Sequence, residues 1–296
     1  MFHQVVVAGI GALGSEVARN LGLLGCESVF VADADRLEEK NIKRSVLFRE
    51  GAAGQSKVSS ALDRLRAWFP QTHWSGASVE IADVDPERFL KAEVLFSCVD
   101  TDLARTEISA IAATYGFPVC DAGLGGTSTR VGRVSWFPDA DSAACFACLL
   151  TSKRRAALLS VWESDVHTCW DKTQEEAAQW TSTATMASIV AGLQVEIALS
   201  AAKERNDAFS VYVDLDQTPI SRTVQHRQSA ECPFHTEVSG ALFPICTLAE
   251  CGTCRRQLSP NRRIAWVRRW GVCPSCGSRE LIIRESSRTE VIGSVS

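Results

Sequence analysis

Residues 5–14 read VVVAGIGALG, and this stretch decides the fold of the chain. A short apolar run ends at Gly9, and apolar residues then recur at helical spacing over residues 13–24. The stretch therefore predicts a strand, a tight turn and a helix. Glycines at such a turn let the backbone approach phosphate groups, and the helix N-terminus offers N–H donors to an anion. Gly9, Gly11 and Gly14 are accordingly candidate nucleotide-binding residues.

Strands and helices are expected to alternate beyond this stretch. Expected strands cover residues 28–32, 94–99, 117–120 and about 209–215, and expected helices cover 55–68, 104–115 and about 183–203. This alternation predicts an α/β fold with a doubly wound, Rossmann-like and mostly parallel sheet. A hairpin is expected over residues 127–137. The polar and irregular residues from about 151 to 180 are expected to form a crossover loop.

The composition allows one large domain with a smaller appendage. With 296 residues and 46% hydrophobic content, the chain can bury one full α/β core. Cysteine, proline and glycine become dense near residue 239. We therefore expect a nucleotide-binding α/β domain over residues 1–238 and a small module over residues 239–296.

Net charge and hydropathy indicate which partners and which cellular location to expect for the protein. The net charge of −4 argues against general binding of polyanions, so nucleic acid is not an expected partner. The N-terminus lacks the basic and apolar regions of a secretory signal, which predicts a cytoplasmic protein. The longest apolar stretch, residues 187–202, is interrupted by Gln194 and Glu196 and therefore predicts a buried helix, with no membrane span.

The acidic residue at the end of the second expected strand supports a nucleotide site. Asp33 lies 19 residues past Gly14, where a carboxylate can accept a hydrogen bond from a ribose hydroxyl. The glycine turn and this aspartate together predict an adenine nucleotide, and they suit NAD as well as ATP. Glycines required only for tight packing are the alternative explanation.

Charged residues farther along the chain separate these two nucleotides. Asn41, Arg44, Lys57 and Asp100 follow the glycine turn in that order. Transfer of a nucleotidyl group builds negative charge on phosphate oxygens, which cations and Mg²⁺ stabilise, whereas hydride transfer has no such requirement. The order of these residues therefore favours ATP. Taken singly, Arg44 and Lys57 also suit a solvated surface, and Asp100 suits a helix N-cap.

The sequence resembles the ThiF/MoeB-like activating proteins, the family that includes the ubiquitin-activating enzymes. The matching stretches are GIGALGSEVARNLGLLG, VADADRLEEKNIKRSVLF, GQSK and SCVDTDLAR, and they lie within residues 5–105. By this resemblance Mg·ATP would be held at the ribose by Asp33, at the phosphates by Asn41, Arg44 and Lys57, and at the magnesium by Asp100. Arg105 would be a supporting residue of the same motif.

Three features depart from the pattern of this family. Ser45 stands where the family usually has Gln, and Thr101 replaces an Asn. No helix precedes the first expected strand to carry an arginine into a neighbouring active site. The resemblance implies a homodimer, while this last departure argues against catalysis shared between its subunits.

Enzymes that resemble these proteins pass the adenylated carboxylate to a thiol on a mobile crossover loop. Cys169 is the cysteine in the irregular segment, and His167 and Lys172 are close enough in sequence to lower its pKa if the loop folds them nearby. A buried or incidental thiol is the alternative. Other cysteines, such as Cys98 and Cys120, lie in or beside core elements and are expected to act as small hydrophobes.

Paired cysteines predict two structural zinc ions. Two Cys-x-x-Cys pairs separated by 18 residues have the spacing of a zinc ribbon; its ligands would be Cys251, Cys254, Cys273 and Cys276. The family resemblance implies a second site with the ligands Cys145, Cys148, Cys232 and His235. A solvated loop histidine is the alternative for His235. The ribbon also carries arginines and tryptophans that suit nucleic acid, an acidic protein partner or a merely solvated surface.

These features predict an enzyme that uses Mg·ATP to adenylate the C-terminal carboxylate of a ubiquitin-like or sulfur-carrier protein. A thioester on Cys169 and transfer to a conjugating enzyme would follow. One alternative is adenylation of a peptide or a tRNA-linked carboxylate without a thioester. Others are a catalytically inactive nucleotide-binding scaffold whose ribbon recruits partners, and an NAD oxidoreductase.

Overall fold

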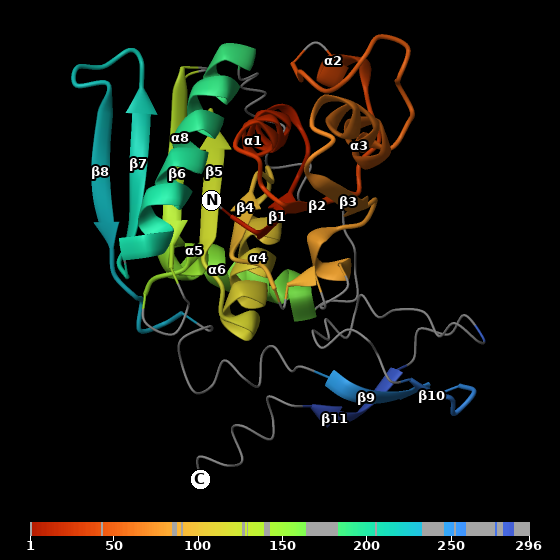
Figure 1. Ribbon diagram of the computed structural model, residues 1–296. Helices are drawn as coiled ribbons and strands as arrows, with labels where there is room; N and C mark the ends of the chain where they lie inside the picture. Colours follow the sequence, from red (N-terminus) through yellow and green to blue (C-terminus); the bar gives the residue numbers. More distant parts are fainter. Residues whose placement is uncertain are drawn as a thin grey trace.

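The central apolar runs of the sequence lie within one eight-stranded sheet in a computed structural model of the protein (Figure 1). The structure describes residues 2–42, 44–84, 88–89, 91–125, 128, 130–138, 143–163, 183–204, 206–232, 246–251, 253–258, 276 and 281–286. The strands lie in the order β3 (His73–Ala77), β2 (Ser28–Ala32), β1 (Gln4–Ala8), β4 (Val94–Ser97), β5 (Val119–Leu124), β6 (Val131–Phe137), β7 (Ala208–Asp214) and β8 (Ser221–His226). From β3 to β5 neighbouring strands are parallel, and from β5 to β8 they are antiparallel.

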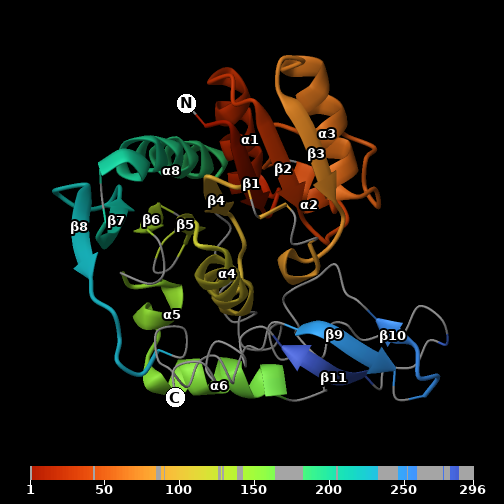
Figure 2. The same ribbon diagram turned by 60° about the horizontal axis from the view of Figure 1, so that its bottom comes forward.

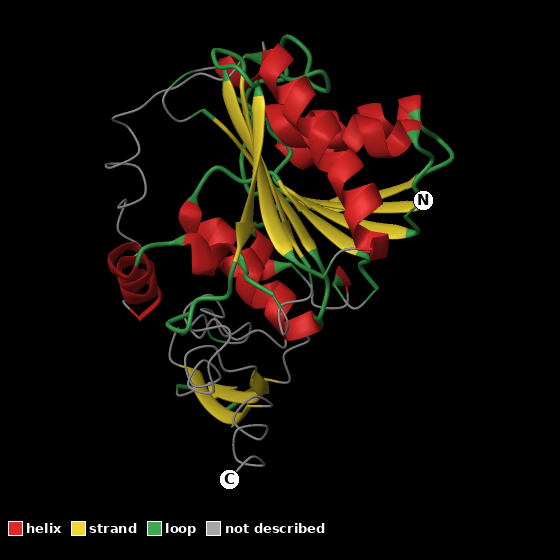
Figure 3. Ribbon diagram, turned by 90° about the vertical axis from the view of Figure 1, so that its left-hand side faces the viewer, coloured by secondary structure: helices red, strands yellow, loops and turns green. Residues whose placement is uncertain are grey.

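Helices cover both faces of this sheet. One face packs against α1 (Ala12–Leu23), α3 (Lys57–Trp68) and α8 (Ala184–Glu204), and the other against α4 (Asp102–Tyr115) and α5 (Phe146–Leu149) (Figure 2). The sheet twists between these two helical layers (Figure 3). Because the central strands are buried on both faces, their sequences are continuous apolar runs without polar alternation. The predicted doubly wound, mostly parallel sheet is therefore confirmed.

Helix α8 contains the longest apolar stretch of the described chain. By length and composition, residues Ala184–Ala202 are sufficient to cross a membrane. This helix packs against α1, β5 and β6, and its buried Gln194 donates hydrogen bonds to the carbonyl oxygens of Ser97 (3.1 Å) and Cys120 (2.7 Å). Burial in the protein core thus explains the apolar composition, as expected from the sequence.

Two regions differ from the elements expected from the sequence. The hairpin expected over residues 127–137 has the wrong bounds, because this region supplies the single strand β6, which forms a hairpin with the preceding antiparallel strand β5. The supposedly irregular segment begins with a helix, α6 (Ser152–Glu163). Arg155 anchors this helix by donating from Nε to the carbonyl oxygen of Ala147 at 3.1 Å. Its apolar residues do not gather on one face, so helical periodicity did not reveal it.

The remaining elements are short or belong to the C-terminal part. The helix α2 (Glu39–Ile42) and the 3₁₀ turn η1 (Ile81–Asp83) connect strands of the large sheet. A separate antiparallel sheet has the order β10 (Gln257–Leu258), β9 (Cys246–Cys251) and β11 (Leu281–Ser286). Cys254 and Cys276 are exposed near its strands. Cys273 and the side chain of Cys251 lie outside the described residues, so the zinc ribbon stays a prediction.

Candidate functional site

The glycine turn between β1 and α1 is held against the end of β4. Gly9 has a φ of +86°, and its N–H donates to the carbonyl oxygen of Ala32 at 2.8 Å. A Cβ atom at Gly9 would lie 2.7 Å from the carbonyl oxygen of Cys98, and one at Gly14 would lie 2.0 Å from the carbonyl oxygen of Gly9. Packing alone therefore requires these two glycines. A Cβ at Gly11 would meet nothing within 4 Å, so packing does not explain Gly11.

Asp33 is bound to this turn by its carboxylate. Oδ2 accepts a hydrogen bond from the N–H of Ile10 at 2.7 Å, and Oδ1 accepts one from the N–H of Asp35 at 2.9 Å. Burial raises the pKa of Asp33 above its ordinary value of 3.8, and the positive charge of Lys57 opposes that shift. The end of β2 therefore presents a half-buried carboxylate beside the glycine turn.

Lys57 begins α3, whose N-cap Ser56 accepts a hydrogen bond from the N–H of Ser59. The Lys57 side chain is only 10% exposed, and its Nζ lies 2.7 Å from Oδ2 of Asp35. A solvated surface position is therefore wrong for this lysine. Through Asp35, its cationic group is connected to Asp33 and so to the glycine turn.

The segment with Asn41 and Arg44 lies beside the same turn. Oδ1 of Asn41 accepts a hydrogen bond from the N–H of Glu38 at 2.9 Å, and Nε of Arg44 donates to the carbonyl oxygen of Lys40 at 3.1 Å. Ser45, one of the departures from the family pattern, shares a 2.6 Å hydrogen bond with the hydroxyl of Ser15 in α1. The segment is thus tied to the first turn of α1, while Asn41 and Arg44 bind their own backbone.

Asp100 lies in the turn that leads from β4 into α4. Its side chain is exposed, and the cap of α4 is Thr101, whose Oγ1 accepts a hydrogen bond from the N–H of Ala104 at 3.1 Å. Capping therefore does not explain Asp100. Because Cys98 touches Gly9 and Gly14, this turn and the glycine turn lie at the same edge of the sheet.

Three thiols gather where α5 begins. Sγ of Cys145 lies 3.9 Å from Sγ of Cys148 and 3.6 Å from Sγ of Cys232. Cys232, which follows β8, lies far along the chain from the pair Cys145 and Cys148, which precedes α6. Burial, and then the neighbouring thiols, raise the pKa of Cys145. His235 lies outside the described residues.

Comparison with known proteins identifies the family. Residues 2–248 match the ThiF family. The chain belongs to the ThiF family. SUMO-activating enzyme subunit uba-2 of Caenorhabditis elegans is 26% identical over 125 residues, which are 42% of this chain and 22% of that protein. Adenylyltransferase and sulfurtransferase uba4 of Aspergillus niger is 30% identical over 120 residues, 40% of this chain and 25% of that protein. The aligned part thus spans about a quarter of these relatives.

Solved structures share the fold of this chain. The crystal structure of E. coli MccB with AMPCPP and MccA has a TM-score of 0.59 and 16% identity, over 79% of this chain and 67% of that chain. The crystal structure of PaaA has a TM-score of 0.54 and 20% identity, over 76% and 72%. At these identities the likeness shows the fold alone.

The other thiols of this ThiF chain differ in their availability. Burial raises the pKa of Cys26 to about 11, and burial with the negative charge of Asp121 raises the pKa values of Cys98 and Cys120. These three are poor nucleophiles, as expected of small core residues. Cys169, with His167 and Lys172, lies outside the described residues.

A buried polar group in this ThiF fold was missed by sequence reasoning. Asp121 in β5 is 1% exposed and lies between Arg105 of α4 and Arg133 of β6. The available signal was a single carboxylate inside an otherwise apolar strand, because such a charge is rarely buried without partners. Its partners were not predictable, since Arg133 reaches it only through the pairing of β5 with β6.

Proposed function

We propose that this protein is an ATP-dependent adenylyltransferase that activates the C-terminal carboxylate of a small ubiquitin-like or sulfur-carrier protein. One observation carries the proposal: a continuous series of contacts connects the glycine turn through Asp33 and Asp35 to the buried Lys57. Membership of the ThiF family supports the same chemistry. Hydride transfer by an NAD oxidoreductase builds no new charge on the phosphates, so it does not require a buried cation beside the phosphate-binding turn.

The side chains at this edge suit the reaction. A carboxylate oxygen of the carrier attacks the α-phosphorus of ATP, the bond to the β-phosphate oxygen breaks, and pyrophosphate leaves with the bonding electrons. In this proposal the backbone N–H groups of the turn around Gly11 bind phosphate oxygens. Lys57 and Arg44 stabilise the negative charge that develops on these oxygens. When ATP binds, the side chains of Asn41 and Arg44 would leave their hydrogen bonds to the backbone and bind phosphate oxygens instead.

Asp100 fits the role of a magnesium ligand. It is an exposed carboxylate that no helix cap requires, and it lies at the same edge as the glycine turn. Magnesium in nucleotide sites binds one or two carboxylates and keeps several waters, so one such side chain suffices. When bound, the ion would supply positive charge to the phosphates.

The three-thiol cluster fits a structural zinc site. A tetrahedral zinc with bonds of ~2.3 Å to sulfur places its thiolates about 3.8 Å apart, close to the separations between Cys145 and its two neighbours. We propose His235 as the fourth ligand and a second zinc in the ribbon. Four protein ligands leave no open position, so both ions would stabilise structure and would not activate water.

The described ends of the crossover segment support a thioester on Cys169. Helix α6 begins beside the first turn of α4, where Nε of Arg154 lies 3.1 Å from Oδ2 of Asp102. Helix α8 begins where Met186 packs near Gly132, opposite Leu124 at the end of β5. The chain therefore enters and leaves this segment near the proposed site. A conjugating enzyme as acceptor and a homodimer, which the resemblance implies, stay predictions. The cytoplasmic location, which is inferred from the sequence itself, also stays a prediction.

Exchange of labelled pyrophosphate into ATP, with and without a panel of ubiquitin-like and sulfur-carrier proteins, tests the proposal. We expect exchange that requires both Mg²⁺ and one carrier, and a carrier adduct that reducing agents release. The adduct should be lost in Cys169→Ala and kept in Cys98→Ala, which removes a thiol near the same edge. Absence of exchange with every carrier would refute adenylation of a carrier.

The other outcomes identify the alternatives. Exchange with a peptide or a tRNA that bears a free carboxylate in place of a carrier, unchanged in Cys169→Ala, would indicate adenylation without a thioester. Tight binding of ATP without exchange in any mixture would indicate a scaffold.

A further inference from the structure

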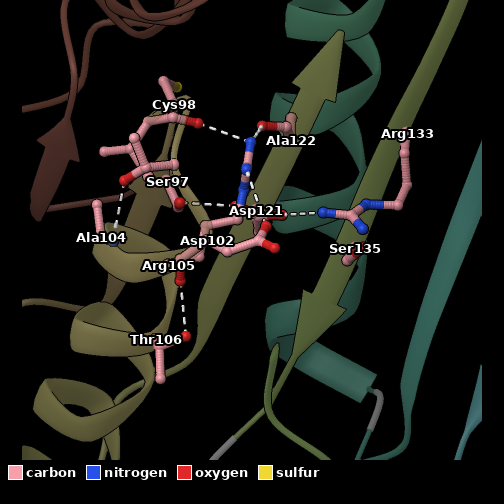
Figure 4. A network of polar contacts seen from close by, with 12 residues as sticks. Ser97, Cys98, Asp102, Ala104, Arg105, Thr106, Asp121, Ala122, Arg133 and Ser135 are labelled. Carbon is pink, nitrogen blue, oxygen red and sulfur yellow. Dashed lines mark hydrogen bonds and ion pairs between the residues drawn. The ribbon is translucent and has the colours of Figure 1, made fainter. Parts of the chain in front are cut away.

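The buried carboxylate of Asp121 has no part in the reaction proposed above. It accepts hydrogen bonds from Oγ of Ser97 (2.7 Å), Nε of Arg105 (3.1 Å) and Nη2 of Arg133 (2.7 Å). Figure 4 shows the two guanidinium groups on either side of it. Buried ion pairs of this kind add little net stability, because desolvation offsets the Coulomb attraction. Stability alone therefore does not account for this arrangement.

Arg105 connects this carboxylate to the turn that carries Asp100. While Nε of Arg105 donates to Asp121, its Nη2 donates to the carbonyl oxygen of Val99 at 2.7 Å. Val99 immediately precedes Asp100. The planar guanidinium has N–H groups in fixed directions, so anchoring one side of it at Asp121 determines where the other side places the carbonyl.

Arg133 provides an internal comparison. It also donates to Asp121, and its guanidinium lies over the Phe146 ring at 5.7 Å, against 5.8 Å for Arg105. Within the described part of the chain, Arg133 makes no hydrogen bond to the turn that carries Asp100. The two arginines thus share a carboxylate and an aromatic neighbour, and of the two it is Arg105 that contacts the turn. Arg105 also donates from Nη2 to the carbonyl oxygen of Ala122 at 3.4 Å, and its Nη1 lies 3.9 Å from Oδ1 of Asp102.

We propose that Asp121 is a positioning residue: through Arg105 it holds the carbonyl of Val99 and so orients the Asp100 carboxylate toward the magnesium of bound ATP. The proposal rests on the adenylation proposed above. A carboxylate on an exposed turn loses entropy when it binds an ion, and holding the turn beforehand removes part of that cost. Asp121 itself touches neither nucleotide nor metal in this scheme.

The matched variants Arg105→Lys and Arg133→Lys test it. Each keeps its positive charge, but the ammonium of lysine cannot reproduce the two-sided contact of Arg105. In the nucleotide-free protein, hydrogen–deuterium exchange of a peptide spanning residues 98–105 should quicken in Arg105→Lys and stay unchanged in Arg133→Lys. The Mg²⁺ concentration for half-maximal binding of a non-hydrolysable ATP analogue should rise about tenfold in Arg105→Lys alone, the effect of weakening one charge-assisted contact.

Further measurements separate positioning from general damage. Binding of the analogue in EDTA should be the same in both variants, since only the metal-dependent part is affected. Asp121→Asn should change hydrogen–deuterium exchange and Mg²⁺ dependence in the same direction as Arg105→Lys but less, because the amide still accepts one hydrogen bond. If the Arg105→Lys protein does not fold, Asp121→Asn takes its place in the comparison.

Two results would overturn the proposal. One is an equal change of hydrogen–deuterium exchange and Mg²⁺ dependence in both lysine variants, and the other is wild-type hydrogen–deuterium exchange and Mg²⁺ dependence in Arg105→Lys. Failure of the wild-type protein to bind nucleotide would instead count against the proposed function. The hydrogen–deuterium exchange measurement, which needs no nucleotide, would still decide whether Asp121 and Arg105 hold the turn.

Discussion

Replacing Gly11 by alanine should separate nucleotide binding from folding. Gly11 has a φ of −71°, ordinary for an L-residue, and an added Cβ would meet nothing within 4 Å. Loss of glycine at this N-cap position should cost under about 1 kcal/mol of stability. The methyl group would occupy space beside the N–H donors where we place phosphate. Weakening one hydrogen bond to a charged group costs about 1.5–3 kcal/mol, which is roughly ten- to a hundredfold in affinity for ATP.

Two further glycines make the comparison decisive. Gly14→Ala places a Cβ 2.0 Å from the carbonyl oxygen of Gly9, so the backbone must move and the protein should lose about 1–3 kcal/mol of stability. Gly192→Ala adds a methyl group in open space within α8. It should leave affinity for ATP unchanged and stabilise the helix by about 0.5–1 kcal/mol.

Thermal unfolding without nucleotide and calorimetric titration with ATP measure the two effects separately. We expect Gly11→Ala to melt near the wild-type temperature and to bind ATP weakly. Wild-type affinity in Gly11→Ala would refute the reasoning, because the phosphates would then not lie on this turn.

Three other results are expected. Lys57→Met should lower pyrophosphate exchange by about a hundredfold or more, whereas Lys40→Met, which removes an exposed ion pair, should have little effect on that rate. Because burial raises the pKa of Asp33, affinity for ATP should fall on acidification at a higher pH than for an exposed aspartate, and titrations across pH should show that this fall is lost in Asp33→Asn. The folded state binds this proton more tightly than the unfolded chain, so its contribution to stability is present below the ordinary pKa and is lost as pH rises through the raised value. Metal analysis should find two zinc ions per chain, with one lost in Cys148→Ser, which also lowers the melting temperature, and the other lost in Cys276→Ser.

The core elements were predictable because their patterns are strong. The strand expected at residues 28–32 is β2, and the helix expected at about 183–203 is α8. In contrast, β3 and β8 were not foreseen. They are the edge strands of the sheet, and β8 is largely exposed, so neither has a continuous apolar run.

The candidate site was predictable in part for a similar reason. The glycine turn and Asp33 follow directly from local spacing, since a strand, a turn and the next strand lie close along the chain. The Asp121 group was not predictable, because its partners come from α4 and β6 and meet only when the sheet has formed.

Local order along the chain determined the doubly wound sheet and the residues at the end of each strand. Tertiary structure decided which of those residues remain available to a ligand. Packing accounts for Gly9 and Gly14 but not Gly11, and Thr101 caps the helix, so capping does not account for Asp100. The physical reason is that availability depends on the atoms that strand register and helix packing bring near a residue, and no short sequence pattern contains those atoms.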